Sequence, residues 1–159
     1  MNDNPFLDAA LQYAGRGWRV FPLRPRGKTP LIRGGYKAAT VAPSAIERWW
    51  GKWPMANVGI ATGAPSGLVV IDVDGEEGVA TLQRLIAQAG EGIGKPIGAV
   101  FTARGFHLYY DLAHHDYDLK CSSGGGLDVR ANGGFVLAPP SVHPSGKVYT
   151  WVKVTELAS

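Results

Sequence analysis

Cysteine is almost absent from this chain of 159 residues, because Cys121 is its only one. A lone cysteine excludes an internal disulfide and a zinc cluster built from several cysteines. We therefore expect the chain to work in a reducing, cytoplasmic setting. Long hydrophobic runs are missing as well: none approaches the ~18 residues that a membrane-spanning helix needs. The sequence thus predicts no membrane partner.

Charge is also sparse, since only 18% of the residues are charged while 45% are hydrophobic. This balance is typical of a folded globular protein and not of a disordered one. The length suits a single domain over residues 1–159 with one real core. Glycine (22 residues) and proline (11 residues) are plentiful, which predicts many turns and close approaches of the backbone to a ligand.

The net charge of +3 is unevenly distributed. Residues 1–54 carry nine of the Lys and Arg residues against three acids, whereas acids outnumber cations in the rest. The stretch 23–37 contains five cations, among them Lys28, and no acid. Prolines and glycines interrupt it, so it is predicted to be a basic loop. Such a loop suits nucleotide phosphates or a nucleic-acid backbone; the alternative is a solvated loop that aids solubility.

The order of the predicted elements favours an α+β fold. The predicted helices cover residues 5–15, 43–53 and 76–89, and the predicted strands cover 18–23, 57–63, 68–74, 99–103, 106–111, 127–130, 135–138 and 148–152. In the third helix one apolar stripe is formed by Val79, Leu82, Leu85, Ile86 and Ala89. A strand-rich second half argues against a repeating βαβ array.

The most informative stretch is Leu68–Gly75, a run of branched apolar residues that carries Asp72 and Asp74 near its end. Alternate side chains of a strand leave the same face, so both aspartates point one way while Ile71 and Val73 point into the core. Carboxylates this close repel each other, which should raise the pKa of at least one of them. A divalent cation between them relieves the repulsion, and Mg²⁺ is commonly held by carboxylates together with substrate phosphates. The stretch predicts a metal site; the alternative is an acidic strand end that opens a loop.

Two further strands carry candidate residues. In the strand over 106–111, His107 is predicted to face the site, where it can donate to a phosphate oxygen or move a proton. Arg104, just before it, suits phosphate binding. In the strand over 127–130, Asp128 and Arg130 share a face, so Asp128 can complete the site while Arg130 pairs with a phosphate or a base. The alternatives are a structural histidine and an ordinary surface ion pair.

A proline pair at 139–140 fixes an extended path into the following turn. Ser141 and His143 are predicted to project from this rigid turn and to supply a second phosphate or ribose contact. A purely structural turn is the alternative.

These motifs also occur in a characteristic order. A basic Gly-Lys-x-Pro loop at 27–30 is followed by Asn-Val-Gly-Ile-Ala-Thr-Gly at 57–63, the Asp-x-Asp strand, Arg-Gly-Phe-His at 104–107, Leu-Asp-Val-Arg at 127–130 and Ala-Pro-Pro-Ser-Val-His-Pro-Ser-Gly at 138–146. The series resembles the bifunctional DNA primase/polymerase (prim-pol) domain of the archaeo-eukaryotic primase superfamily, over roughly residues 6 to 152. Such domains occur in replication proteins of bacteria, phages, plasmids and other mobile elements, so the chain is expected to be such a domain or a piece of a longer replication protein.

The resemblance implies a template-directed nucleotidyltransferase, acting on nucleoside triphosphates with a single-stranded or primed DNA template. By their motif positions, Asp72, Asp74 and Asp128 would ligate two Mg²⁺ or Mn²⁺ ions, and His107 would contact the triphosphate. Gly105 stands where the family often has serine. The family fold implies a catalytic sheet resembling an RNA-recognition motif, joined to an N-terminal αβ unit with the active site in the cleft between them. A fused or separate helicase is the further partner that it suggests.

Two other functions fit parts of the pattern. An apolar strand ending in Asp-x-Asp also opens phosphatases of the haloacid-dehalogenase kind, but there Thr or Val normally follows, whereas Gly75 follows here. A non-catalytic nucleic-acid-binding module would use the basic loop and the tryptophans Trp49, Trp50 and Trp53. DNA binding by such a module would survive the loss of Asp72 and Asp74.

Overall fold

The computed structural model describes residues 3–90, 94–112 and 120–158. Two antiparallel sheets and three α-helices make up a mixed α+β fold, as the sequence predicts. In chain order the elements are α1 (Pro5–Gly15), β1 (Val20–Leu23), η1 (Gly35–Ala38), α2 (Pro43–Lys52), β2 (Asn57–Ala61), β3 (Leu68–Asp74), α3 (Gly75–Ala89), β4 (Gly98–Phe101), β5 (Gly105–Asp111), β6 (Ser122–Gly124), β7 (Leu127–Arg130), β8 (Phe135–Ala138), β9 (Thr150–Val152) and η3 (Val154–Ala158).

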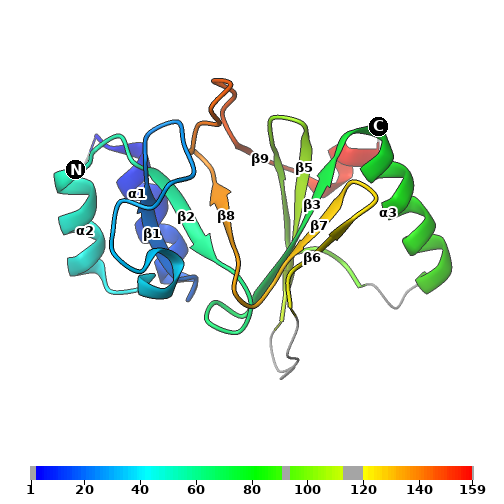
Figure 1. The fold of residues 1–159 in the computed structure, drawn as a ribbon, viewed down its shortest axis with the longest axis horizontal. Coiled ribbons are helices and arrows are strands. Elements are labelled where there is room, and N and C mark those ends of the chain that lie inside the picture. Colours follow the sequence, from blue (N-terminus) through cyan, green and yellow to red (C-terminus); the bar gives the residue numbers. More distant parts are fainter. Residues whose placement is uncertain (1–2, 91–93, 113–119, 159) are drawn as a thin grey trace.

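The N-terminal unit is a three-stranded sheet in the order β1-β2-β8, with α1 and α2 packed on its outer face (Figure 1). Asn4 caps α1, because its side-chain oxygen accepts hydrogen bonds from the backbone N–H groups of Phe6 and Leu7. All residues of β1 and β2 are buried, which explains why neither strand alternates between apolar and exposed polar residues; the one polar side chain in them, Asn57, is buried as well. The third strand of this sheet, β8, comes from the C-terminal part of the chain and ties the two halves together.

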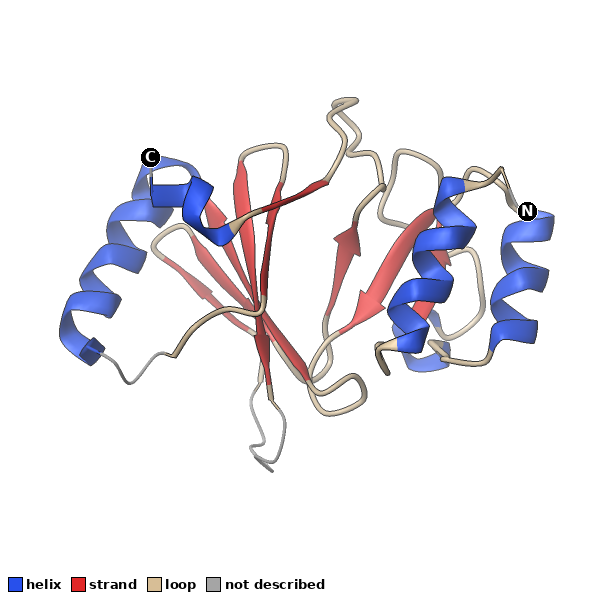
Figure 2. Cartoon of the chain, turned by 180° about the vertical axis from the view of Figure 1, so that it is seen from behind, coloured by secondary structure: helices blue, strands red, loops and turns tan. Residues whose placement is uncertain are grey.

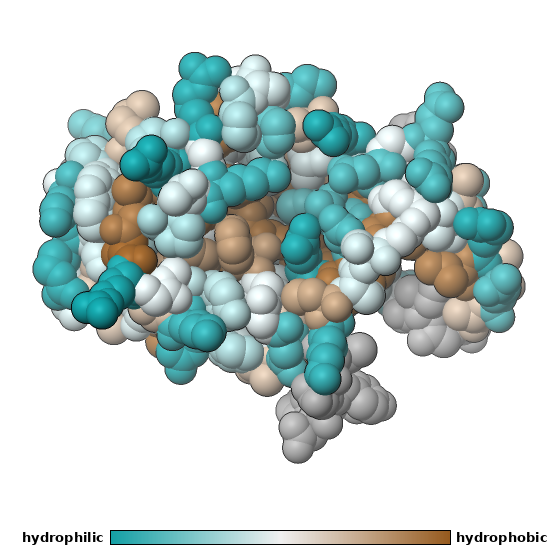
Figure 3. Space-filling model, viewed as in Figure 1, coloured by the Kyte–Doolittle hydropathy of each residue, from teal (hydrophilic) through white to brown (hydrophobic). Residues whose placement is uncertain are grey.

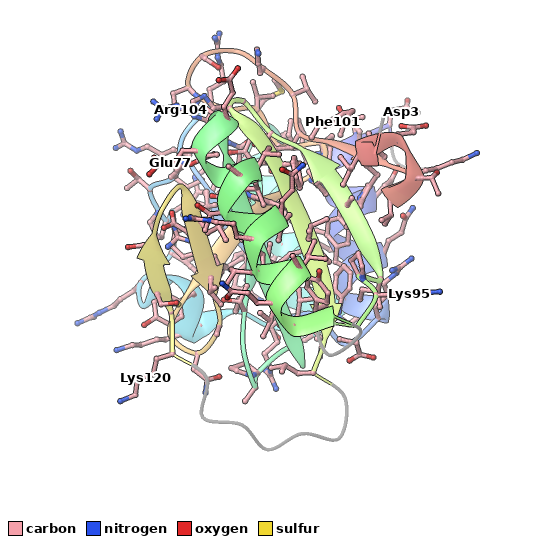
Figure 4. All side chains as sticks on the ribbon, turned by 90° about the vertical axis from the view of Figure 1, so that its right-hand side faces the viewer. Asp3, Glu77, Lys95, Phe101, Arg104 and Lys120 are labelled. Atoms are coloured by element: carbon pink, nitrogen blue, oxygen red, sulfur yellow. The ribbon has the colours of Figure 1, made fainter. Side chains whose placement is uncertain are left out.

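The larger sheet has six strands in the order β6-β7-β3-β5-β4-β9. Helix α3 lies diagonally across one of its faces (Figure 4), while the other face turns toward the N-terminal unit (Figure 2). Successive side chains of β3 point alternately to the two faces of the sheet. Val73 packs in the cluster under α3, whereas Val70 belongs to the core shared with the three-stranded sheet. Asp72 and Asp74 have the same parity as Val70, so they face the N-terminal unit.

Helix α3 buries less of its apolar stripe than the sequence pattern indicates. Of that stripe only Leu82 is buried, while Leu85 and Ile86 are 45% and 46% exposed. The contact runs instead through Gly78, whose missing side chain leaves room for the carbonyl oxygen of Gly126: a Cβ there would lie 2.6 Å from that oxygen. The helix therefore sits close against the turn before β7 with its first half and exposes its second half.

Aromatic side chains join the two units. The hydroxyl of Tyr13 on α1 donates to the carbonyl of Pro139 after β8 and accepts from the indole N–H of Trp151 on β9, at 3.0 Å. Trp18 and Tyr109 pack beside them, with ring centroids 5.6 Å apart. Packed aromatic rings, of which Tyr13, Trp18 and Tyr109 are buried, therefore join the two sheets in addition to the connecting chain. Within the described residues, no helix combines the length and apolar character needed to cross a membrane.

Candidate active site between the two sheets

The candidate site is centred on Asp72 in the middle of the six-stranded sheet. Strand β3 pairs with β5 on one side and with β7 on the other, and the two registers place Asp72 opposite both His107 and Asp128. Residues directly opposite in an antiparallel pair have Cα atoms about 4.5–5.5 Å apart. Three residues that the sequence singled out in separate segments therefore lie side by side on the face that looks toward the N-terminal unit.

Asp72 and His107 form the most buried polar contact of the site. Nε2 of His107 lies 3.4 Å from Oδ1 of Asp72, and the two side chains are only 5% and 19% exposed. This separation is too long for a well-formed hydrogen bond, and both Oδ1 of Asp72 and Nδ1 of His107 are buried without a hydrogen-bond partner among the described residues. Burial works to raise the pKa of Asp72, but His107, Arg130 and Lys28 outweigh it and lower that pKa. Asp72 is therefore an ionised, under-coordinated carboxylate.

The pKa of Asp74, which lies on the same face two residues further along β3, is shifted in the opposite direction. Its pKa is raised by burial and by the negative charges of Asp72 and Asp128, against which Arg104 is a smaller influence. Asp128 is held by Arg130, whose guanidinium nitrogen lies 3.3 Å from Oδ2. The three carboxylates thus repel one another, and the expected rise of at least one pKa falls on Asp74.

This donor set fits a hard divalent cation. Mg²⁺ and Mn²⁺ take oxygen ligands, and the buried Oδ1 of Asp72 is an acceptor that the described protein atoms leave without a donor. Among the described residues no three acidic, histidine or cysteine side chains are already gathered into a coordination shell.

A pocket of about 170 Å³ opens above Asp72 and Asp74. Its other walls are mostly cationic or polar and come from three loops and from β5. The lining residues are Lys28, Asp72, Asp74, Thr102, Ala103, Arg104, His107, His143 and Tyr149. On the face shown in Figure 3, hydrophilic side chains dominate the upper edge, where these loops approach one another. A pocket with acidic residues at its base and cations around its rim suits a metal-bound polyphosphate.

The basic loop brings Lys28 to this pocket through a tight turn. The N–H of Arg24 donates to the carbonyl of Thr29 at 2.8 Å, and the N–H of Gly27 donates to the carbonyl of Arg24 at 3.0 Å. Arg26 between them has a positive φ of 55°. The loop is therefore a hydrogen-bonded turn that presents Lys28 toward the acidic residues.

His143 lines the same pocket from the opposite loop. Its Nδ1 accepts a hydrogen bond from the backbone N–H of Ser145 at 3.0 Å. The neutral ring consequently carries its proton on Nε2, which is left as a donor. Burial, Lys28 and Arg104 together lower the pKa of His143, so the ring is neutral at pH 7.

A second, smaller pocket of about 100 Å³ adjoins the first and shares Lys28, Asp72, His107 and Tyr149 with it. Arg130 and the β8 residues 135–137 complete its lining. Its wall is therefore partly apolar. Phe135 is half-buried there and stacks on Tyr36 of η1, with ring centroids 6.4 Å apart.

One candidate from the sequence, Ser141, lies elsewhere. It is fully buried, and its hydroxyl accepts from the N–H of Val58 at 2.8 Å and donates to the carbonyl of the same residue at 3.2 Å. The prediction of a phosphate or ribose contact is wrong for this side chain, because the turn after the proline pair folds inward onto β2. The candidates Lys28, Arg104, His107, Arg130 and His143 line one or both pockets. Asp128 lines neither pocket and is placed beside Asp72 by the β3–β7 register.

Gly105 has a steric reason to be glycine. A Cβ on it would lie 1.9 Å from the carbonyl oxygen of Val73, since β5 approaches β3 closely at this point. The serine that the resemblance leads one to expect here has no space in this structure.

Tyr149 is a pocket residue that sequence reasoning missed. It lies just before β9, is only 5% exposed and lines both pockets. Its ring packs edge-on against His107, at 5.9 Å between centroids, and stacks on His143 at 6.4 Å. Burial and the charges of Asp72 and Asp74 raise its pKa to about 12. Its position between two histidines depends on the path of the 142–149 hairpin, which no local pattern specifies.

Two comparisons with known proteins bear on the family of the chain. A comparison with curated proteins gives no match. A family model, described as bifunctional DNA primase/polymerase, N-terminal, matches residues 10–159. Nearly the whole chain is covered, including both sheets and every residue of the two pockets. The chain therefore belongs to the bifunctional DNA primase/polymerase (Prim-Pol) family and has a primase/polymerase-type function.

Proposed function

We propose that the chain is a template-directed nucleotidyltransferase that joins nucleoside triphosphates by two-metal phosphoryl transfer. The observation that carries this proposal is the register of β3. It sets Asp72 between Asp128 and His107 at the base of a pocket whose rim is cationic. Family membership supports a nucleotidyltransferase in general, and the geometry of the site supports the finer proposal.

Strand extension requires a 3′-hydroxyl to attack the α-phosphorus while pyrophosphate leaves in line with it. Asp72, Asp74 and Asp128 would hold Mg²⁺ or Mn²⁺, which when bound neutralises charge on the attacking and leaving oxygens. The protein's own part is to position the reactants. Repulsion among the three carboxylates favours the metal-bound state over the metal-free one.

The cationic rim would bind the triphosphate. Lys28 and Arg104 lie on opposite loops of the first pocket and supply positive charge. His143 supplies a neutral N–H donor from Nε2. Nε2 of His107, which faces Asp72 at 3.4 Å, would donate to a phosphate oxygen once that carboxylate turns to a cation.

The second pocket would hold the sugar and base of a nucleotide next to the metals. Phe135 offers an aromatic surface there, and Arg130 offers a donor for a base or a phosphate. Because the two pockets share Asp72 and His107, one nucleotide can occupy both, with its α-phosphate at the acidic residues.

The test is incubation with a single-stranded template, labelled nucleotides and Mn²⁺, with and without an annealed primer. The wild type should release pyrophosphate and lengthen the strand, whereas Asp72→Asn and Asp128→Asn should lose at least about a thousandfold in rate. The matched control is Asp8→Asn, an exposed acid on α1 that lies outside both pockets.

The same assay separates the competing functions. A haloacid-dehalogenase-like phosphatase would instead release phosphate from p-nitrophenyl phosphate. A non-catalytic module would bind the template without incorporating nucleotides, and its binding would be indifferent to Asp72. The structure gives that module little support, since Trp50 is buried at 1% exposure and donates its indole N–H to the carbonyl of Ala56.

A further inference from the structure

Asn57, at the start of β2, is a buried polar residue outside both pockets, with an exposed fraction of 0%. Its side chain makes three hydrogen bonds to two separate loops. Nδ2 donates to the carbonyl of Gly27 at 3.0 Å and to the carbonyl of Val142 at 2.8 Å, and Oδ1 accepts from the N–H of Val142 at 2.9 Å. Both N–H groups and the oxygen of the side-chain amide are thus hydrogen-bonded to backbone groups of the two loops.

The two residues held by Asn57 directly precede two residues of the first pocket. Gly27 precedes Lys28, and Val142 precedes His143. The loops are 115 residues apart in sequence, from 27 to 142, so only the fold brings them to one amide. Fixing the backbone immediately before each side chain limits where that side chain can reach.

The loop that carries His143 is in turn hydrogen-bonded to the loop that carries Arg104. The N–H of His143 donates to the carbonyl of Lys147 at 2.8 Å and closes a small hairpin. Nζ of Lys147 then donates to the carbonyl of Ala103 at 3.3 Å, next to Arg104. Asn57 therefore lies at the base of a connected rim that carries Lys28, Arg104 and His143.

We infer that Asn57 is a positioning residue for nucleotide binding, whose single amide sets the spacing between Lys28 and His143 across the triphosphate pocket. This inference rests on the proposed function. The amide of Asn57 joins the 24–29 loop to the 142–147 loop directly, through backbone groups of both. Its effect is indirect, because it touches neither the carboxylates nor the pocket itself.

The experiment compares Asn57→Ala and Asn57→Asp with Ser66→Ala. Asn57→Asp keeps an acceptor for the N–H of Val142 but sets a carboxylate against two carbonyl oxygens. Ser66→Ala also removes a side chain–backbone hydrogen bond, a part-buried one that the Ser66 hydroxyl accepts from the N–H of Arg19 at 2.9 Å, and neither residue lines a pocket. Hydrogen exchange of the free protein is measured first. Both Asn57 variants should speed exchange in the 24–30 and 142–147 segments together by about tenfold, with β3 unchanged.

Binding and kinetics follow on the same proteins. The KM for the incoming nucleotide should rise about tenfold in the Asn57 variants. The dissociation constant for Mn²⁺ alone should stay at the wild-type value, because the carboxylates are untouched. The Ser66→Ala control should lower the melting temperature without changing either quantity.

The outcomes separate the two claims. Faster loop exchange in a protein whose wild type incorporates no nucleotide would overturn the proposed function, and with it the role in nucleotide binding. An active wild type whose Asn57 variants keep the wild-type KM, or lose Mn²⁺ affinity as strongly as nucleotide affinity, would overturn the inference about Asn57 alone.

Discussion

Asp72 and His107 face each other across the β3–β5 pair, with 3.4 Å between Oδ1 and Nε2. The contact buries an ionised carboxylate beside an imidazole, and it leaves Oδ1 of Asp72 and Nδ1 of His107 without a hydrogen-bond partner among the described residues. Buried polar groups are usually hydrogen-bonded, and leaving them unpaired costs about 1–3 kcal/mol each. In the proposed function a bound cation would pair with the orphaned Oδ1 of Asp72, and Nε2 of His107 would then be released to donate to a phosphate oxygen.

His107→Ala should therefore affect nucleotide binding more than the chemical step. We expect the KM for the incoming nucleotide to rise about tenfold, because one charge-assisted donor is lost. His107→Gln, which keeps an N–H donor, should recover part of the loss. Steady-state incorporation kinetics measure both. A variant with wild-type KM and a much lower kcat would instead assign His107 to proton transfer.

Asp74 should oppose folding when no metal is bound. Its pKa is raised by burial, Asp72 and Asp128, so its ionisation costs more in the folded than in the unfolded chain, and stability declines as the pH rises through that pKa. Asp74→Asn should accordingly melt higher than the wild type in EDTA at pH 7. The two should converge below pH 3.8, the ordinary value for the group, where both states are protonated.

With divalent metal present, the wild type should instead melt at a higher temperature than Asp74→Asn. Millimolar Mn²⁺ or Mg²⁺ should raise the melting temperature of the wild type by a few degrees, since a ligand that binds only the folded state stabilises it. The shift in Asp74→Asn should be smaller. A wild type that melts at the same temperature with and without metal would contradict a carboxylate-held cation.

Lys28 and Arg24 offer a matched pair on one exposed loop, of which only Lys28 lines the pockets. Lys28→Ala should raise the KM for the nucleotide about tenfold, by removing a charged donor to phosphate. Arg24→Ala should weaken only salt-sensitive binding of the template, because it carries long-range charge alone. Equal effects of the two variants on KM would mean that the loop acts by net charge and not by position.

Gly105→Ser should harm the fold instead of restoring a serine contact. The Cβ would lie 1.9 Å from the carbonyl oxygen of Val73, so two paired strands must separate at the site. We expect a loss of about 3 kcal/mol in unfolding free energy, measured by urea denaturation. Gly15→Ser is the control, because a Cβ there meets no atom within 4 Å.

The Tyr13 link between the units should give a pH signature. Burial raises the pKa of Tyr13 to about 12 from 10.0, so above pH 10 the unfolded chain ionises while the folded chain does not. The stability from this phenol is complete below pH 10 and is lost as the pH rises toward 12. Tyr13→Phe should be less stable at pH 8 and lose less stability between pH 10 and 12, as monitored by urea denaturation.

Local patterns were sufficient for most of the elements and for the orientation of the two aspartates on the acidic strand. Alternation along Leu68–Asp74 predicted that Asp72 and Asp74 share a face, and the structure confirms it, because the pleat of a strand leaves no other choice. The α+β class followed similarly from helices early and strands late. The apolar stripe of α3 is less buried than its spacing suggests, because the helix packs through Gly78 against the turn before β7, a contact that spacing alone does not reveal.

By itself the sequence determined which residue types are present for the proposed phosphate and metal chemistry, and it determined their order along the chain. Only the tertiary structure decided which of them meet. Strand register placed Asp128 and His107 on either side of Asp72. The path of the loop after β8 turned Ser141 inward onto Val58 and brought Tyr149 between two histidines. The physical reason is that strand identity depends on neighbours along the chain, whereas register and loop contacts depend on side chains far apart in sequence that must pack and hydrogen-bond together.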